Sequence, residues 1–364
     1  MTHIEELIQE LCPEGIEHVA LDEVVKIRNG SDYKALGAGE VPVYGSGGIM
    51  TTVDTAVHGG PSVLIPRKGS LGNLFYVDQP FWTVDTIFYT EIDLTRLMPK
   101  FFYYSMYKHR LAEKNQAGGV PSMTQSYLKK LRIPVPPLEV QREIVRVLDK
   151  FTQLEAELEA ELEARRAQYN HYRHEAFSFG SEVETRPLGE LAWNLDNRRK
   201  PVTRDARKPG NIPYYGASGV VDYVSGYIFD GDYLLVSEDG ANLLARSTPI
   251  AFSVSGKTWV NNHAHVLQFD TYVERRFVEI YLNSIDLAPF ISGSTQPKLN
   301  KANLNRIPIP APSLEVKERV VDILDKFDAL VNDISVGLPA ELAARRKQYE
   351  HYRDRLLTFK ELAA

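Results

Sequence analysis

Apolar residues recur at alternating intervals of three and four positions in two long segments of the chain. They are Ile144, Val147, Phe151, Leu154 and Leu158 in the first segment, and Val320, Ile323, Phe327, Leu330 and Ile334 in the second. This spacing is typical of a coiled-coil seam. A single helix would leave such a stripe in water, whereas two equivalent helices can cover each other. The pattern therefore predicts two long helices that pair in antiparallel orientation.

The two predicted helices differ in their continuity. The run LEAELEAELEARR at 154–166 consists of good helix formers and should extend the first helix without a break. The second helix meets Gly337 and Pro339 at the corresponding place, which predicts a kink or a restart. A Pro-rich elbow precedes each helix, at 133–137 and 307–312, and separates it from the residues before.

The residues before each elbow have a different pattern. Short β-branched runs such as PSVLIP and GDYLLVS alternate with turn signals, and apolar segments at 97–113 and 275–291 have helical character. This mixture predicts an α/β (α+β) globule before each helix. The predicted domains are a first globule at 1–132, an elbow and long helix at 133–180, a second globule at 181–306, and an elbow and C-terminal helix at 307–364.

The chain is an internal duplication. ARRAQYNHYR at 164–173 returns as ARRKQYEHYR at 344–353, and VPVYGSGGI at 41–49 corresponds to IPYYGASGV at 212–220. The two elbows and their helices also correspond, so the repeat is a whole half-chain. We therefore expect two globules separated by two long helices that form an antiparallel coiled coil with approximate two-fold symmetry.

Composition narrows the class of protein. The 364 residues suffice for two domains, and the net charge of −6 argues against nonspecific coating of nucleic acid, so any DNA contact must use local patches. The single cysteine, Cys12, excludes a disulfide framework and a multi-cysteine metal site. The sequence shows neither a signal peptide nor an apolar run of about 18 residues. These features predict a cytoplasmic protein that does not contact membranes.

Three motifs carry a resemblance to a known family. They are CPEGIEHVALDEV at 12–24, the segment from GSTQPKLN to LDKFDAL at 293–330, and the paired helix ends of the ARRKQYEHYRDRLL type. With these motifs the chain resembles, over nearly its whole length, the specificity subunit of type I restriction-modification systems.

The resemblance implies a function and a set of partners. Each globule would be a target recognition domain that reads one half of a bipartite, asymmetric site in double-stranded DNA, and the helices would set the spacer between the halves. The subunit would not be a catalyst. It would bind two methyltransferase subunits and two restriction (motor-nuclease) subunits, and S-adenosylmethionine, ATP and Mg would be cofactors of these partners only.

Candidate DNA-binding residues lie in loops that both halves share. The YGSGG and YGASG turns allow close approach to a phosphate, although a structural turn explains them equally well. The loops at 66–73 and 237–243 differ in charge, as two different half-sites would require, with basic residues suited to guanine and carboxylates suited to cytosine. Solvated loop charge is the alternative. In the first half the candidates are Tyr44, Ser46, Arg67, Lys68, Ser70, Asn73, Gln125 and Lys129.

The second half adds a basic run, NRRKPVTRDARK at 197–208, and a segment rich in hydrogen-bond donors, GSTQPKLNK at 293–301. The first suits phosphate contact and the second suits adenine edges. A flexible charged loop and a capped loop before the elbow are the respective alternatives. The candidates here are Arg198, Arg199, Lys200, Arg204, Lys208, Tyr215, Ser218, Glu238, Asn242, Thr295, Gln296, Lys298, Asn300 and Lys301.

Arginine and tyrosine residues at the two helix ends are candidates for partner binding, because both types are enriched at interfaces. They are Arg165, Arg166, Tyr169, Tyr172, Arg345, Arg346, Tyr349 and Tyr352. Packing between the helices and the globules is the alternative, and both roles can hold together.

Signals for catalysis fail on inspection. SGKT at 255–258 is not a phosphate-binding loop because Ala251 replaces the first glycine, and His171 and His174 share a helix face without a third metal ligand. His263 and His265 are expected to be strand residues. Two alternatives to the specificity subunit stay open, a self-contained DNA-modifying enzyme and an assembly scaffold that does not bind DNA.

Overall fold

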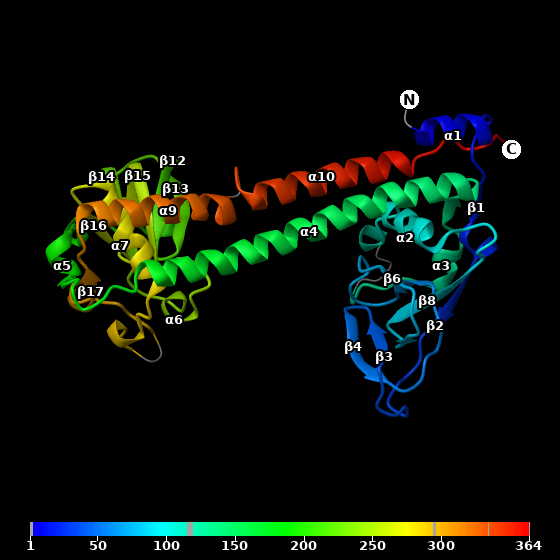
Figure 1. Cartoon of the computed structure of the whole chain (residues 1–364), viewed down its shortest axis with the longest axis horizontal. Coiled ribbons are helices and arrows are strands. Elements are labelled where there is room, and N and C mark those ends of the chain that lie inside the picture. Colours follow the sequence, from blue (N-terminus) through cyan, green and yellow to red (C-terminus); the bar gives the residue numbers. More distant parts are fainter. Residues whose placement is uncertain (1–2, 115–118, 294–295, 334, 364) are drawn as a thin grey trace. The chain divides into compact units, whose positions relative to one another are not determined.

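The computed structural model describes residues 3–114, 119–293, 296–333 and 335–363 (Figure 1). The chain forms two compact units. The first contains Met1–Glu159 together with Leu342–Ala364, and the second contains Ala160–Glu341. Each unit therefore combines one globule with helical segments from both halves of the duplication.

The first unit is a mixed α/β globule on a helical support. Its strands form a four-stranded sheet in the order β2-β8-β5-β6, a three-stranded sheet in the order β4-β3-β7, and the pair β1-β9. Its strands are β1 (His18–Ala20), β2 (Val25–Asn29), β3 (Val41–Gly45), β4 (Gly48–Val53), β5 (Ser62–Pro66), β6 (Phe75–Val77), β7 (Trp82–Thr83), β8 (Ile87–Ile92) and β9 (Arg132–Pro134). Its helices are α1 (His3–Leu11), α2 (Pro99–Lys108), α3 (Gln125–Lys129), the first part of α4 (Leu138–Ala176) and most of α10 (Leu338–Leu356), with 3-10 turns at Leu21–Glu23 and Leu111–Lys114.

The main core of the first unit joins the globule to its helices. Phe101 and Phe102 of α2 are fully buried with Ile144 and Leu148 of α4, and Leu357 after α10 belongs to the same cluster. The N-terminal part of α4 is thus a core element of the globule and also a support for it.

The second unit repeats this plan with one larger sheet, in the order β11-β16-β14-β15-β12-β13, and the pair β10-β17. Its strands are β10 (Thr185–Pro187), β11 (Trp193–Asn194), β12 (Pro209–Gly216), β13 (Gly219–Val224), β14 (Phe229–Ser237), β15 (Ala251–Val260), β16 (Ala264–Gln268) and β17 (Pro308–Pro310). Its helices are α5 (Leu188–Leu191), α6 (Asn242–Ala245), α7 (Tyr272–Ser284), α8 (Lys301–Asn305), α9 (Leu314–Asn332) and the second part of α4, with 3-10 turns at Asp196–Arg198, Arg204–Ala206 and Ala288–Phe290.

One strand explains why the sheets differ. In the second unit β15 is continuous, so it pairs antiparallel with β14 and parallel with β12, and joins all the strands into one sheet. In the first unit the corresponding stretch is divided into β6 and β7 by the residues DQPF at 78–81. Pro80 has no N–H to donate to a neighbouring strand, so the break leaves two smaller sheets.

The predicted helices form as expected. Helix α4 runs for 39 residues without a break, and α9 ends at Asn332 before α10 begins at Leu338, which confirms the predicted restart (Figure 1). Gly337 permits this junction, because a Cβ there would lie 2.4 Å from the Ala329 carbonyl oxygen.

The helices pair as the duplication requires. In the first unit Phe151 of α4 stacks on Tyr352 and also contacts Tyr349, while Arg346 forms ion pairs with Glu155 and Glu159. Positions rise along α4 as they fall along α10, so the pairing is antiparallel. In the second unit the reciprocal contact places Phe327 of α9 against Tyr169 and Tyr172 of α4.

The buried positions differ from part of the predicted seam. Leu154, Ile323 and Leu330 are 39%, 44% and 37% exposed, whereas Val321, Leu324 and Val331 of α9 are buried; Ile334 lies outside the described residues. Since each helix packs against its own globule as well as against another helix, its buried face is wider than a coiled-coil stripe and is rotated from it. Within the described ranges, none of the helices has the length and apolar character to cross a membrane.

Candidate nucleic-acid interface

Three segments singled out in the sequence lie in contact in the first unit: the turn at 44–48, the charged loop at 66–73 and the described part of the donor segment, 119–130. The Asn73 side chain donates from Nδ2 to the Ser46 carbonyl oxygen at 3.2 Å. The Gly69 amide donates to the Pro121 carbonyl oxygen at 2.9 Å. The charged loop thus lies between the turn and the donor segment and bonds to both.

The second unit joins the three equivalent segments, at 215–219, 237–243 and 296–300, with the same acceptor in the turn but a different donor. Ser237 Oγ donates to the Ala217 carbonyl oxygen at 2.5 Å. The Gly240 amide donates to the Pro297 carbonyl oxygen at 3.2 Å, which reproduces the bond between Gly69 and Pro121 in the first unit. We call the three joined segments of each unit its loop surface. The duplication therefore builds the same composite surface twice.

The charge of the loop surface differs between the units. Isolated backbone bridges join Lys68 to Ser122 in the first unit and Asp239 to Lys298 in the second. Because these two bridges are equivalent, a basic side chain in one unit stands where the other has a carboxylate. Two surfaces that have equivalent backbone bridges but different side chains can bind chemically different ligands.

A buried charge network lies behind the second loop surface. His265 of β16 places Nδ1 2.7 Å from the Asp196 carboxylate, and Arg199 places Nη1 2.5 Å from the Glu238 carboxylate. Arg199 also approaches Asp196 at 3.4 Å. Burial alone would raise the pKa of both carboxyls, but the bond from His265 to Asp196 and the bond from Arg199 to Glu238 outweigh it, so both pKa values are lowered.

This network includes the one group of potential metal ligands found among the described residues, Asp196, Glu238 and His265. Their acceptor atoms already have donors. Arg199 contacts both carboxylates, the Val266 amide donates to Asp196, and His265 Nε2 faces the Leu299 carbonyl oxygen. A guanidinium thus holds the position that a cation would take, and the arrangement is that of an ion-pair network.

Several predicted DNA-binding residues have intramolecular partners. Glu238 is 8% exposed and pairs with Arg199 and Lys298. The Asn242 side chain bonds Thr248 and Ser247, Asn300 caps α8, and Gln125 donates to Asn29. Tyr44 packs on Phe75 and Phe81, and Tyr215 packs on Phe252. These contacts give the residues roles in holding the loops, and their contacts with DNA stay predictions.

Other predicted residues are accessible on the surface. Arg198 lies over the Phe229 ring and donates to the Ile228 carbonyl oxygen, and Arg67 and Lys129 are half-buried. Thr295 lies outside the described residues. Ser46 is half-buried as well. Besides Arg198, the exposed candidates are Lys68, Ser70, Asn73, Lys200, Arg204, Lys208, Ser218, Gln296, Lys298 and Lys301.

The predicted partner-binding residues divide between packing and exposure. Tyr169 is buried against Phe327, and Tyr349 is half-buried against Phe151, which is the packing role considered above. Tyr172 and Tyr352 are 39% and 36% exposed and lie at equivalent positions. The arginines of this set lie on the helix surfaces; Arg165 bonds Glu161 and Gln168, and Arg346 bonds Glu155.

The sequence analysis missed the network residues Asp196 and His265. His265 is a strand residue as predicted, whereas His263 lies in the turn before β16 and pairs with Asp239. Alignment of Trp82 with Trp259 places His265 opposite Phe88 of the first half. A histidine at a buried strand position that is apolar in the other copy is the signal that could have identified the network.

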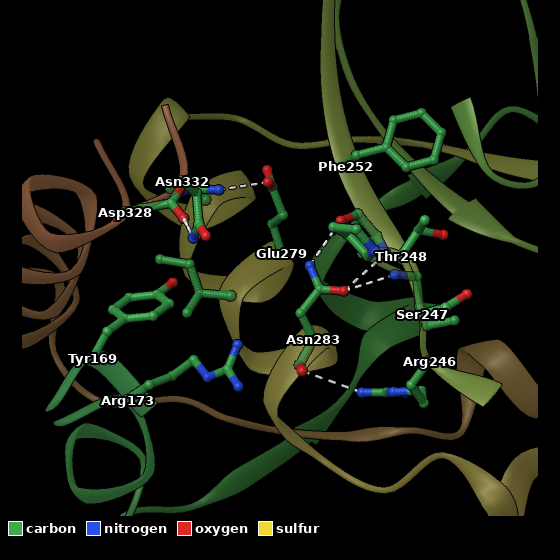
Figure 2. Close-up of a pocket in the computed structure, with 15 residues that line it drawn as sticks. Tyr169, Arg173, Arg246, Ser247, Thr248, Phe252, Glu279, Asn283, Asp328 and Asn332 are labelled. Carbon is green, nitrogen blue, oxygen red and sulfur yellow. Dashed lines mark hydrogen bonds and ion pairs between the residues drawn. The ribbon is translucent and has the colours of Figure 1, made fainter. Parts of the chain in front are cut away.

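A separate polar pocket of about 460 Å³ lies in the second unit, between α4, α7, α9 and the 246–252 segment (Figure 2). Arg276 on its wall pairs with Glu279, Asp325 and Asp328. Arg246 donates to three carbonyl oxygens at the end of α7, and its Nη1 is buried without a partner among the described residues. The ion pairs of Arg276 with Asp325 and Asp328 join α7 of the globule to α9.

Comparisons with known proteins agree with the duplicated plan. The family model described as type I restriction modification DNA specificity domain matches residues 13–164 and again 180–344. A putative type I restriction enzyme specificity subunit of Haemophilus influenzae, S.HindORF215P, is 44% identical over 187 residues, which cover 50% of this chain and 48% of the relative. The match thus spans about half the length of that relative.

A second relative matches over more of its length. The EcoR124I/EcoR124II specificity subunit of Escherichia coli is 31% identical over 297 residues, covering 74% of this chain and 73% of the relative. The crystal structure of a type I restriction-modification S subunit from M. genitalium has a TM-score of 0.63 at 18% identity, over 94% of this chain and 96% of that one, and shows the same fold. On the two family-model matches and these relatives, the chain belongs to the family of type I restriction-modification DNA specificity proteins.

Proposed function

We propose that this chain is the DNA-specificity subunit of a type I restriction-modification complex, in which each globule reads one half of a bipartite, asymmetric DNA site. The observation that carries the proposal is the loop surface, which is assembled from equivalent segments in both units. An equivalent backbone bond joins the charged loop to the donor segment in each unit, and a side chain of the β5 or β14 strand-and-loop segment donates to equivalent carbonyl oxygens of the turn, Ser46 and Ala217. Loops on a rigid scaffold are the usual place for recognition residues.

The difference in charge between the loop surfaces supports an asymmetric site. The first unit presents Arg67 and Lys68, which suit the acceptor edge of guanine, and the second presents Asp239 at the position of Lys68. A carboxylate suits the amino group of cytosine. Side chains of opposite charge at one backbone position would select different bases in the two half-sites.

We further propose that the chain binds methyltransferase subunits through its helices and has no catalytic role of its own. Leu154 and Leu330 are equivalent residues and are exposed to nearly the same degree, as are Tyr172 and Tyr352. Exposed apolar and aromatic residues that recur in both copies suit two copies of one partner. S-adenosylmethionine, ATP and Mg would then act in the methyltransferase and restriction subunits.

The test is to map methylated adenines in cells that express this chain with its methyltransferase subunit and in cells that lack this chain. We expect one bipartite motif with two unlike halves and a fixed gap, present only when the chain is present. A purified chain that methylates DNA alone would instead identify an enzyme. Complexes that form normally but bind DNA without regard to two separated half-sites would identify an assembly scaffold.

A further inference from the structure

The charge network behind the second loop surface holds one of the segments that form it. His265 is 1% exposed at its side chain, and its Nε2 lies 2.7 Å from the Leu299 carbonyl oxygen. Leu299 belongs to the donor segment at 293–300. The same ring places Nδ1 2.7 Å from Asp196 Oδ2. One buried imidazole therefore connects the donor segment to Asp196, in the turn that follows the edge strand β11.

The geometry requires the charged form of this imidazole. Both the carboxylate and the carbonyl oxygen accept hydrogen bonds, so both ring nitrogens must donate. A neutral imidazole carries one N–H, whereas the imidazolium carries two. Arg199 and Lys298 are the other cations of the network, and they pair with the carboxylates of Asp196 and Glu238.

The neighbouring charged groups hold the same segment. Glu238, 3.8 Å from the His265 ring, accepts from Lys298 Nζ at 3.1 Å, and its own carbonyl oxygen accepts the Leu299 amide at 2.8 Å. His263 and Asp239 form a separate, half-exposed pair at 2.9 Å on the turn beside the network. These groups, with Asp196 and Arg199, are the charged groups that surround His265.

The first unit lacks this device at the equivalent place. Phe88 of β8 pairs with Ile65 as His265 pairs with Val236, so the two positions correspond. Phe88 also pairs with Asn29 on the neighbouring strand, and Arg67 lies over the Phe88 ring. A phenyl ring has no N–H to donate, so among the described residues the side chain at this position makes no hydrogen bond to the donor segment of the first unit.

We propose that His265 is a positioning residue that holds residues 296–300 of the donor segment in the conformation that reads the second half-site. The inference rests on the proposed function and concerns only one of its two half-sites. Removal of the imidazole would break the bond to the Leu299 carbonyl oxygen and one of the bonds to Asp196. Discrimination at the second half-site should therefore depend on this ring, whereas discrimination at the first half-site should not.

The test uses the full chain in its methyltransferase complex and a pool of duplexes randomised at both half-sites. His265→Phe, which copies the first unit, should reduce base discrimination in one half of the motif about tenfold, the value of one charge-assisted hydrogen bond. His3→Asn is the control, since it removes an exposed histidine of α1 that lies outside both loop surfaces, and it should leave both halves unchanged. Equal discrimination by His265→Phe and the wild type, or equal losses in both halves, would overturn the inference.

Two conservative variants give a second measurement that does not depend on folding of His265→Phe. The amide of His265→Gln can donate from about the place of Nε2 to Leu299, whereas the amide of His265→Asn replaces only Nδ1, which faces Asp196. Discrimination at the second half-site should be retained in His265→Gln and reduced in His265→Asn, and equal discrimination by the two variants contradicts the inference. A wild-type motif without two halves would instead contradict the proposed function.

Discussion

At the residue scale, one contact between globule and helix is built with different chemistry in the two units. In the first unit Lys100 pairs with Asp149 of α4 at 2.6 Å, and the lysine side chain is 40% exposed. In the second unit Arg276 pairs with Asp325 and Asp328 of α9 and with Glu279, and its side chain is 15% exposed. The contacts should therefore contribute differently to stability.

We expect Arg276→Met to lower the free energy of unfolding of the second unit by about 3 kcal/mol, because it leaves the buried Glu279 and the half-buried Asp325 and Asp328 without their cation. Lys100→Met is the matched variant and should cost less than about 1 kcal/mol, because its ion pair is exposed. Denaturant unfolding followed by hydrogen exchange in α7 and α2 measures the two losses. Losses of the same size would show that burial does not govern these ion pairs.

Asp196 and Glu238 should make the second unit sensitive to acid. Burial opposes their ionisation, but bonds from His265 and Arg199 prevail and the pKa of each carboxyl is lowered in the folded chain. Such a group contributes stability above its unfolded pKa, about 4, and loses it as pH falls through the folded value. We expect the protection of β16 amides from hydrogen exchange, relative to the intrinsic exchange rate at each pH, to fall from about pH 5 downward, and less so in Asp196→Asn. An unchanged acid response in that variant would contradict this linkage.

The network also shows where sequence reasoning ends at this scale. The candidate loops could be chosen because both copies carry Gly, charged residues and amides at the same places. Whether a side chain such as Glu238 faces a ligand or a neighbouring arginine depends on distances set by the sheet, and Arg199 lies 39 residues away along the chain. Local pattern carries no information about that pairing.

At the element scale, the first unit depends on residues from the end of the chain. Leu357 is 1% exposed within the core that contains Phe101, and Phe359 packs against Phe101 with ring centroids 6.5 Å apart. The Leu362 amide donates to the Ile16 carbonyl oxygen at 2.9 Å. The last segment of the second repeat thus completes the fold of the first globule.

Leu357→Ala should therefore destabilise the first unit by about 3 kcal/mol, the usual cost of removing a buried leucine side chain. The second unit should keep its stability, although Leu357 belongs to the second repeat in sequence. Hydrogen exchange in β5 and in β14 separates the two responses. Leu362→Ala, at a residue 45% exposed, is the control and should change neither. Destabilisation confined to β14 would contradict the role of the C-terminal segment in stabilising the first unit.

Helices were more predictable than sheets at this scale. The lengths of α4 and α9 follow from helix formers, prolines and Gly337, which act locally. The faces they bury do not, because Ile323 is exposed and Leu324 is fully buried where a simple seam has the reverse. The division of one sheet into two at Pro80 likewise depends on which strands meet across it.

At the scale of the whole molecule, the duplication explains why each unit contains parts of both repeats. Phe151 of the first repeat contacts Tyr349 and Tyr352 of the second, and Phe327 of the second contacts Tyr169 and Tyr172 of the first. In each of the two contacts, one repeat supplies the phenylalanine and the other repeat supplies both tyrosines. A chain with a single repeat would leave its phenylalanine and its two tyrosines without these partners.

Continuity of α4 makes its length a testable determinant of the DNA site. The helix is continuous through the EAEL repeats, and the division between the two units falls at Glu159 and Ala160 within them. One added EAEL unit after Leu158 lengthens it by about 6 Å. This length is close to two base-pair rises of about 3.4 Å each. If α4 sets the spacer, the gap between the half-sites should widen by about two base pairs, and both half-sites should keep their sequences because the loop surfaces are untouched.

Methylation mapping with the lengthened chain measures this outcome directly. Ala160→Gln, an exposed substitution in the same repeats that keeps the helix length, should leave the gap unchanged. An insertion of seven residues provides a sharper comparison, because it restores the helix face after two turns and adds about 10 Å. It should widen the gap by about three base pairs with less loss of stability than the four-residue insertion, which rotates the face by about 40°. Altered half-sites with an unaltered gap would show that α4 does not act as a ruler, and that the spacing is set by the globules themselves.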